Sequence, residues 1–186
     1  MFKGEKTQGR TLAANLSTSR MIDDIASRYG CTVLRTAVGE ANVVSAMKES
    51  TSIVGGEGNG GVIWPRVTYV RDSLSAIALT IGLIKMFGKP LSAIAAEIPS
   101  YSIVKRKVDL SDTSQARAAA EKVARHFASE RLDLQDGVRV DIESKRAWLH
   151  VRGSNTEPIM RLIAEAPSVD AANRILDEAS AVIAAG

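Results

Sequence analysis

The sequence predicts an α/β protein of two domains: a mixed, mostly parallel α/β/α domain followed by a small α+β domain with antiparallel strands. In the first half, short apolar segments alternate with amphipathic ones, which is the pattern of strands connected by helices in a parallel sheet. In the second half, alternating apolar–polar segments follow one another directly between two amphipathic segments, which indicates an antiparallel sheet. The 186 residues are long enough for two small cores.

Each element of the first half is predicted from its own periodicity and end signals. The predicted strands are 11–17, 31–36, 51–56 and 62–65. The predicted helices are 18–30, 40–49, 71–88 and 90–97. Thr18 or Ser19 is expected to cap the first helix, Gly30 and Gly88 stand where helix-ending glycines belong, and Pro90 suits a first helical turn.

The segment Ile98-Pro99-Ser100 is the predicted domain boundary, because proline disfavours continuation of the preceding helix. We therefore expect residues 1–9 to be a linker, residues 10–98 the first domain and residues 99–186 the second. In the second domain the predicted strands are 101–111, 138–144, 146–151 and 159–166, with a hairpin turn at Ser144 and Lys145. The predicted helices are 113–130 and 168–185.

Composition narrows the class of protein. Apolar residues make up 45% and charged residues 24%, as in globular proteins generally. No apolar run reaches the roughly 18 to 20 residues of a membrane span, and the first residues lack the apolar stretch of a secretory signal. Cys31 is the only cysteine, so no internal disulfide forms and the cytoplasm is the expected compartment. The net charge of +3 and 4% aromatics favour neither nucleic acid nor membrane as a partner.

The first candidate site is the glycine-rich loop GGEGNGG, residues 55–61, which formally contains G-x-G-x-x-G. A dinucleotide site requires a helix directly behind the last glycine, whereas an extended segment with Pro65 follows here. No Gly-Lys-Ser/Thr follows, so this is no P-loop either. Glu57 can accept hydrogen bonds from two adjacent sugar hydroxyls, and Asn59 can donate and accept beside it. The alternative is a plain strand-to-strand turn with Glu57 in water.

The second candidate site is the loop RGSNTEP, residues 152–158, which combines groups that suit a phosphate. A guanidinium fork, two hydroxyls, an amide and a glycine that admits backbone N–H groups come together there: Arg152, Gly153, Ser154, Asn155 and Thr156. Arg161 returns on the following strand, and Glu157 has to point away from an anion, holding an arginine. The alternative is an ordinary polar turn, since Ser, Asn and Thr are common turn residues.

Other candidates have weaker signals. Cys31 is expected in the core and His126 in solvent or at a helix cap. His150 shares a strand face with Trp148 and Arg152. It is therefore either a neighbour of the phosphate loop or a plain surface histidine. The basic run 105–107 is expected to be a solvated strand edge.

Both loops, in this order and at this separation, resemble those of the α-D-phosphohexomutase family. The segment 56–61 resembles the family's sugar-binding loop in its third domain. The segment 152–158, with Arg161 and Glu165-Ala166, resembles the phosphate loop of its fourth domain. Related segments of the family are also matched by NLSTS (15–19), TAVGE (36–40) and RDSL (71–74). Many members carry Ser where Asn59 stands and His where Gly61 stands, and the form found here is more similar to phosphoglucosamine-mutase and phosphomannomutase branches.

The resemblance implies a fourth domain similar to the TATA-binding-protein fold and a reaction that moves phosphate between C1 and C6 of a hexose through a bisphosphorylated intermediate. Glu57 and Asn59 would grip the sugar's O3 and O4, and Gly61 would belong to the same sugar-binding loop. The phosphate that is not transferred would be held by the second loop: Arg152, Gly153, Ser154, Asn155, Thr156 and Arg161.

The family's phosphoserine and its magnesium loop of three aspartates have no counterpart here, since the sequence contains neither a Ser-His-Asn-Pro stretch nor a triple-aspartate loop. The resemblance thus implies the C-terminal half of an enzyme, with no catalytic residue, metal ligand or cofactor of its own. Its partners would be a hexose phosphate and the N-terminal domains 1 and 2, and magnesium is expected in the full-length enzyme. The alternatives are a stand-alone phosphosugar-binding or regulatory module and, with less support, a nucleic-acid binder.

Overall fold

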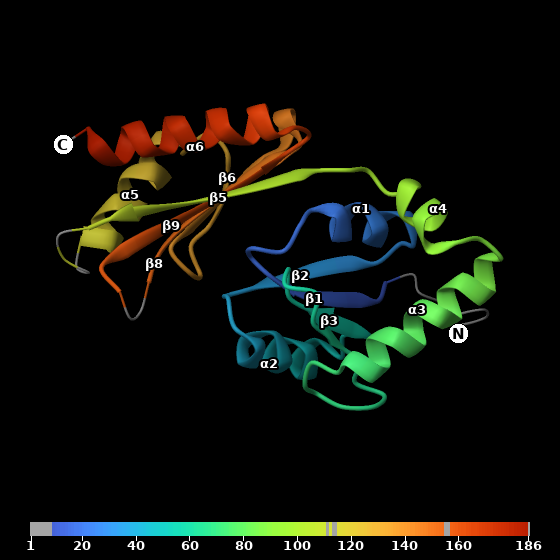
Figure 1. Ribbon diagram of the computed structural model, residues 1–186. Helices are drawn as coiled ribbons and strands as arrows, with labels where there is room; N and C mark the ends of the chain where they lie inside the picture. Colours follow the sequence, from blue (N-terminus) through green and yellow to red (C-terminus); the bar gives the residue numbers. More distant parts are fainter. Residues whose placement is uncertain (1–8, 111, 113–114, 155–156, 186) are drawn as a thin grey trace. The chain divides into compact units, whose positions relative to one another are not determined.

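A computed structural model describes residues 9–110, 112, 115–154 and 157–185 of the chain (Figure 1). The chain divides into two compact units, residues 1–100 and 101–186, and each is described by itself. No helix among the described residues is long and apolar enough to cross a membrane.

The first unit is built on a four-stranded mixed sheet with the order β2-β1-β3-β4. Strands β1 (Thr11–Asn15), β2 (Thr32–Thr36) and β3 (Val54–Gly56) are parallel, and β4 (Val62–Ile63) is antiparallel to β3. Helix α2 (Glu40–Ser50) covers one face and α1 (Met21–Arg28) the other, as Figure 1 shows. Helices α3 (Ser73–Phe87) and α4 (Leu91–Ala96) complete the unit.

Local chemistry explains where these elements begin and end. Asp72 caps α3, because its side chain accepts hydrogen bonds from the backbone N–H groups of Leu74 and Ser75. The Ser75 hydroxyl and backbone bonds hold the pKa of Asp72 below its usual value. Gly88 ends α3 in the left-handed conformation, as expected. Helix α1 begins later than predicted, at Met21 with Arg20 as its N-cap, so neither Thr18 nor Ser19 is the cap.

The second unit is a five-stranded antiparallel sheet with the order β5-β9-β8-β7-β6. Its strands are β5 (Ser102–Asp109), β6 (Arg131–Asp133), β7 (Val138–Ile142), β8 (Ala147–Gly153) and β9 (Ile159–Ala166). Helices α5 (Gln115–His126) and α6 (Val169–Ala184) pack on one sheet face and form a core with its apolar side chains. The short helix η1 (Glu143–Lys145) makes the β7–β8 hairpin, with Arg146 left-handed behind it.

The fold class predicted from the sequence, a mixed α/β/α unit followed by an antiparallel α+β unit, is confirmed. Two details differ. Strand β6 was not predicted, and the helix expected through residue 130 ends at His126. Cys31 is partly exposed rather than fully buried, so the core placement predicted for it is wrong.

The basic run 105–107 lies on β5, the edge strand of the second sheet, and its side chains alternate between the two faces. Lys105 and Lys107 are exposed on the face without helices. Arg106 turns toward α6, where it donates to Asp177 at 2.6 Å and to Asn173 at 2.9 Å. The prediction of a solvated strand edge is therefore correct for the two lysines. It is not correct for Arg106, which is bonded to α6.

Candidate sugar and phosphate sites

The glycine-rich loop is the tip of the β3–β4 hairpin. The backbone N–H of Gly60 donates to the carbonyl of Glu57 at 3.2 Å, and that of Glu57 to the carbonyl of Gly61 at 3.3 Å. Gly60 has a φ of 89°, which favours glycine. The Asn59 side-chain oxygen accepts from the Gly61 N–H at 3.1 Å, so Asn59 helps to shape the tip. Because strand β4 and not a helix follows, the loop is not a dinucleotide-binding turn.

The Glu57 carboxylate is held in place at the carboxyl ends of the parallel strands. Its Oε1 accepts from Asn15 Nδ2 at 2.8 Å and from the Gly39 backbone N–H at 3.2 Å. Its Oε2 lies 3.6 Å from Arg71 Nη1, and the side chain is only 9% exposed. The alternative interpretation, a turn with Glu57 in water, is therefore wrong. A carboxylate fixed by several donors is oriented before any ligand arrives.

The turn after β1 is the main support of Glu57. Asn15 Oδ1 accepts from the Ser17 N–H at 3.1 Å and from the Thr18 hydroxyl at 2.8 Å, which leaves Asn15 Nδ2 for Glu57. Arg35 on β2 donates to the Asn15 carbonyl at 3.1 Å and to the Thr18 carbonyl at 2.8 Å. The segment NLSTS matches the family, but no sequence pattern predicts a role for Asn15 or Arg35. Asn15 is the last residue of β1 and Arg35 the last but one of β2, and polar residues near the carboxyl ends of neighbouring parallel strands are the signal that could have identified them.

Gly61 makes room for Arg71. A Cβ atom on Gly61 would lie 2.2 Å from Arg71 Cδ, a distance that no side chain accepts. Arg71 donates from its backbone N–H and from Nε to Glu40, at 3.1 and 2.6 Å. The hydrogen bond from Arg71 lowers the pKa of Glu40, and the same bond raises the pKa of Arg71. Gly61 was predicted to bind substrate; its contacts within the chain give it a packing role beside Glu57.

The phosphate loop is the tip of the β8–β9 hairpin, closed by the Ser154 N–H donating to the Ile159 carbonyl at 2.9 Å. The sequence predicted that the loop begins at Arg152. Strand β8 continues through Gly153, so Arg152 is a strand residue. Arg152 lies directly opposite Arg161 of β9. Asn155 and Thr156 lie outside the described residues, so their predicted role as phosphate donors rests on the sequence alone.

Arg152 is fixed by an acid that the sequence analysis did not single out. Arg152 Nε lies 3.1 Å from both carboxylate oxygens of Asp136, and the two side chains are 17% and 20% exposed. The next residue, Gly137, has a φ of 72°, and a Cβ there would lie 2.2 Å from the Val151 carbonyl oxygen. Only glycine lets the β6–β7 turn lie this close to β8. The adjacent Asp136-Gly137 pair is a turn signal, but nothing in it indicates an arginine partner.

His150 supports the same turn from beneath. It is fully buried, and its Nε2 lies 2.7 Å from the Asp136 backbone carbonyl. A carbonyl can only accept, so Nε2 carries the hydrogen. Burial lowers the pKa of His150. The interpretation of His150 as a surface histidine is wrong, and its contact is with the backbone of Asp136, whose side chain holds Arg152.

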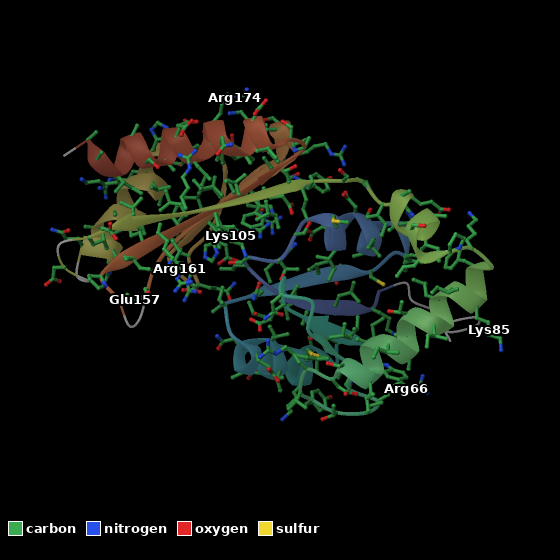
Figure 2. The ribbon with its side chains drawn as sticks, viewed as in Figure 1. Arg66, Lys85, Lys105, Glu157, Arg161 and Arg174 are labelled. Atoms are coloured by element: carbon green, nitrogen blue, oxygen red, sulfur yellow. The ribbon has the colours of Figure 1, made fainter. Side chains whose placement is uncertain are left out.

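Ion pairs and a buried network complete this face of the second unit. Glu157 Oε2 lies 3.8 Å from Arg161 Nη2, so Glu157 holds an arginine as expected (Figure 2). Deeper in the sheet, Trp148 Nε1 donates to Glu165 Oε1 at 2.9 Å, and the Arg139 guanidinium stacks 4.6 Å from the Trp148 ring centroid. These contacts tie β7, β8 and β9 together behind Arg152.

The described residues do not fit a magnesium site. Within that part of the chain no three His, Cys, Asp or Glu side chains come together as metal ligands. Asp23 and Asp24 are the most suggestive acidic pair, but they lie on a helix, and Asp23 is in an ion pair with Arg35. Magnesium in proteins needs oxygen ligands in close array.

Residues 1–101 match the sequence family described as phosphoglucomutase/phosphomannomutase, alpha/beta/alpha domain III, and residues 103–182 match its C-terminal domain. The chain belongs to the phosphoglucomutase/phosphomannomutase family. The resemblance of the two loops to phosphohexomutases is thereby confirmed.

Individual relatives agree with this assignment. A probable phosphoglucosamine mutase of Methanopyrus kandleri is 36% identical over 175 residues, covering 94% of this chain and 38% of that protein. A phosphoglucomutase/phosphomannomutase of Thermococcus kodakarensis is 34% identical over 169 residues, covering 91% and 37%. The chain thus spans little more than a third of the length of these relatives.

Solved structures confirm the fold. A phosphoglucomutase/phosphomannomutase family protein from Burkholderia thailandensis superposes with a TM-score of 0.78 at 22% identity, covering 95% of this chain and 37% of that one. An Aspergillus fumigatus N-acetylphosphoglucosamine mutase, solved with GlcNAc-6P and magnesium, superposes with a TM-score of 0.68 at 14% identity, covering 93% and 38%.

Proposed function

We propose that this chain is the sugar- and phosphate-recognition half of a phosphohexomutase, which interconverts hexose 1-phosphate and hexose 6-phosphate. Arg152 carries the proposal. Its Nε is bonded to Asp136, which orients the guanidinium so that the far edge, with both terminal nitrogens, is the edge offered to a phosphate. Two parallel charge-assisted hydrogen bonds from that edge match two phosphate oxygens. Ser154, Asn155, Thr156 and Arg161 would supply the remaining donors.

Glu57 would bind the hydroxyls of the sugar of a hexose phosphate. One carboxylate oxygen is engaged by Asn15 and Gly39, and the other faces Arg71. A carboxylate oxygen has further lone pairs, so Oε2 accepts from a sugar hydroxyl while it stays near Arg71. Asn59 offers its amide N–H groups beside it, since its oxygen is used within the loop. The sugar of the relatives differs between phosphoglucosamine and phosphomannose types, which leaves the hexose open.

Chemical turnover would belong to other domains of the enzyme. Neither a phosphoserine motif nor a magnesium loop occurs in the sequence. When bound, magnesium would stabilise the phosphate being transferred. The residues of this chain would bind the other phosphate and orient the sugar, and the chain alone would be inactive. A stand-alone phosphosugar-binding module uses the same two loops, and only complementation separates the two functions.

Titration NMR with a hexose 6-phosphate tests the proposal. Part of the enzyme supplies part of the binding free energy, so a Kd near 1 mM, about −4 kcal/mol, is the expected order. Arg152→Ala removes binding, and Arg152→Lys restores only part of it, because a point charge cannot replace the fork. Full affinity in Arg152→Ala contradicts the site. Mutase activity that returns on adding the N-terminal domains of a relative supports the enzyme, and its failure favours the stand-alone module.

A further inference from the structure

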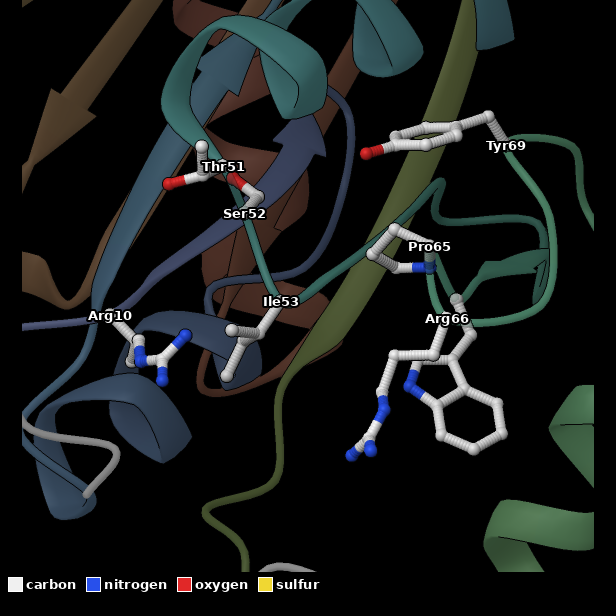
Figure 3. A pocket seen from close by; sticks show the side chains of 8 residues that line it. Arg10, Thr51, Ser52, Ile53, Pro65, Arg66 and Tyr69 are labelled. Atoms are coloured by element: carbon white, nitrogen blue, oxygen red, sulfur yellow. The ribbon is translucent and has the colours of Figure 1, made fainter. Parts of the chain in front are cut away.

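We propose that the first unit has a second anion-binding pocket, built by Arg10 and Arg66, which takes a small phosphate ester with an apolar body. The cavity measures about 330 Å³, within the range of small-molecule sites (Figure 3). Arg10 precedes β1, and the segment 51–53 precedes β3. The two strands are parallel, so the pocket lies at their amino ends.

This position separates the pocket from the candidate sugar site. Glu57 and Asn15 lie at the carboxyl ends of the same strands. Five residues of β1 separate the two edges, a length of about 16 Å at the rise of a strand. The proposed phosphohexomutase function uses none of the residues at the amino ends of these strands. The proposal of a second anion pocket therefore does not depend on that function.

The charge of the pocket points to an anion. Figure 3 shows the guanidinium groups of Arg10 and Arg66 reaching the hollow from its two sides. Among the described residues, no acidic side chain lines the cavity. Lys48 is not part of the lining, but its ammonium lies 5.2 Å from the ring centroid of Tyr69, which is. Planar guanidinium groups bind phosphate oxygens as forks, and two of them suit a dianion.

A buried donor at the pocket independently points to a ligand or solvent acceptor. Trp64 Nε1 is buried, and no described residue accepts its hydrogen. Buried N–H groups in native proteins almost always have a partner, and an orphan requires an explanation. Trp64 lines this cavity, so an acceptor bound there satisfies the indole. The lining also includes the apolar side chains of Ile53, Trp64 and Pro65, against which the body of the ligand packs.

The sequence provides a reporter for each unit. It contains two tryptophans, Trp64 in the first unit and Trp148 in the second, so the two indole N–H signals report separately by NMR. Phenyl phosphate is the probe, with inorganic phosphate and phenol as its anionic and apolar halves. The titration uses the Arg152→Ala protein, which removes the phosphate loop from the readout. Failure of that loop and failure of this pocket are then distinguishable.

We expect phenyl phosphate to shift the Trp64 indole signal and leave that of Trp148 in place. Inorganic phosphate binds at least several-fold more weakly, and phenol at the same concentration causes no shift. Arg10→Gln and Arg66→Gln each weaken phenyl phosphate about tenfold, since each removes one fork. Lys85→Gln on α3, a cation outside the pocket of the same unit, is the matched control and leaves binding unchanged.

Three outcomes overturn the proposal. One is the absence of any shift of the Trp64 indole signal when phenyl phosphate is present at ten times ~1 mM, the Kd typical of weak binding. Another is equal loss of binding in Lys85→Gln, which shows non-specific attraction to a positive surface. The third is undiminished binding in both arginine variants. Thermal unfolding of each variant is measured in parallel, and because both arginines lie at the surface, unfolding is expected to stay unchanged.

Discussion

The Asp136 carboxylate lies 3.1 Å from Arg152 Nε, although the two residues are sixteen positions apart, one in the β6–β7 turn and the other near the end of β8. Gly137 brings the β6–β7 turn against β8, and the buried His150 holds the Asp136 carbonyl. A guanidinium that is oriented before binding loses less conformational entropy when a phosphate arrives. The turn 134–137 is therefore a positioning element for the candidate phosphate site.

Asp136→Asn is expected to weaken phosphate binding about tenfold, or roughly 1.4 kcal/mol, because Arg152 loses its charged partner. Stability should change little, since a partly exposed ion pair contributes about 0 to 1 kcal/mol. Calorimetric titration and urea unfolding measure the two quantities. Asp133→Asn removes the same charge from the end of β6 next to this turn, where the Asp133 carboxylate accepts from the backbone and the side chain of Gln135, and is the matched control. Equal weakening in both variants would mean that net charge, not orientation, is responsible.

Glu57→Gln is expected to weaken binding of a phosphohexose while leaving inorganic phosphate binding unchanged. Glutamine keeps one oxygen for Asn15 and Gly39, so the loop stays folded, but the charged acceptor near Arg71 is lost. The expected loss is about five- to tenfold, or roughly 1 to 1.4 kcal/mol. NMR titration with both ligands measures it. Parallel loss for phosphate and phosphohexose would indicate that Glu57 holds the loop rather than the sugar.

Residue types and their order were enough to predict both units and both loops, because strand periodicity, glycine and proline are local signals. The supporting residues were not predictable in the same way. Asp136 and Arg35 act across strands, and a pairing at such distance leaves no local pattern. Strand β6 has only three residues, too few for a period to appear. Helix α1 begins late in part because the turn anchored by Asn15 uses the hydroxyl of Thr18, one of the two residues expected to cap it.

The stability of the second unit is expected to fall on acidification below about pH 6.5, the unperturbed value for histidine. Burial lowers the pKa of His150, so the unfolded chain binds a proton that the folded chain does not. The unfolding free energy then decreases from pH 6.5 down to the lowered pKa, by up to about 1.4 kcal/mol per pH unit, and levels off below it. Urea unfolding followed by the Trp148 indole NMR signal between pH 5 and 8 measures the slope.

The chain has one other histidine, which provides a control for this slope. His126 ends α5 and contacts Glu178 at 2.8 Å with both side chains about half exposed. His126→Gln should keep the loss of stability on acidification, whereas His150→Gln should reduce it. A slope that survives in His150→Gln would assign the effect to the carboxylates of the unit.

Gly61→Ala is expected to destabilise the first unit by about 1 to 3 kcal/mol, the usual cost of overpacking. The new Cβ would lie 2.2 Å from Arg71 Cδ and 2.7 Å from its Cγ, so the side chain must leave its place between Glu40 and Glu57. Gly82→Ala is the contrasting control. Gly82 lies within α3 with nothing within 4 Å of an added Cβ, and alanine there should stabilise by roughly 0.5 to 1 kcal/mol. Urea unfolding of the two variants should shift in opposite directions, because one substitution displaces an arginine and the other only restricts the unfolded chain. Equal stability of wild type and Gly61→Ala would mean that Arg71 finds a second position at no cost, and phosphohexose titration of that variant would then show whether the displaced arginine had served Glu57.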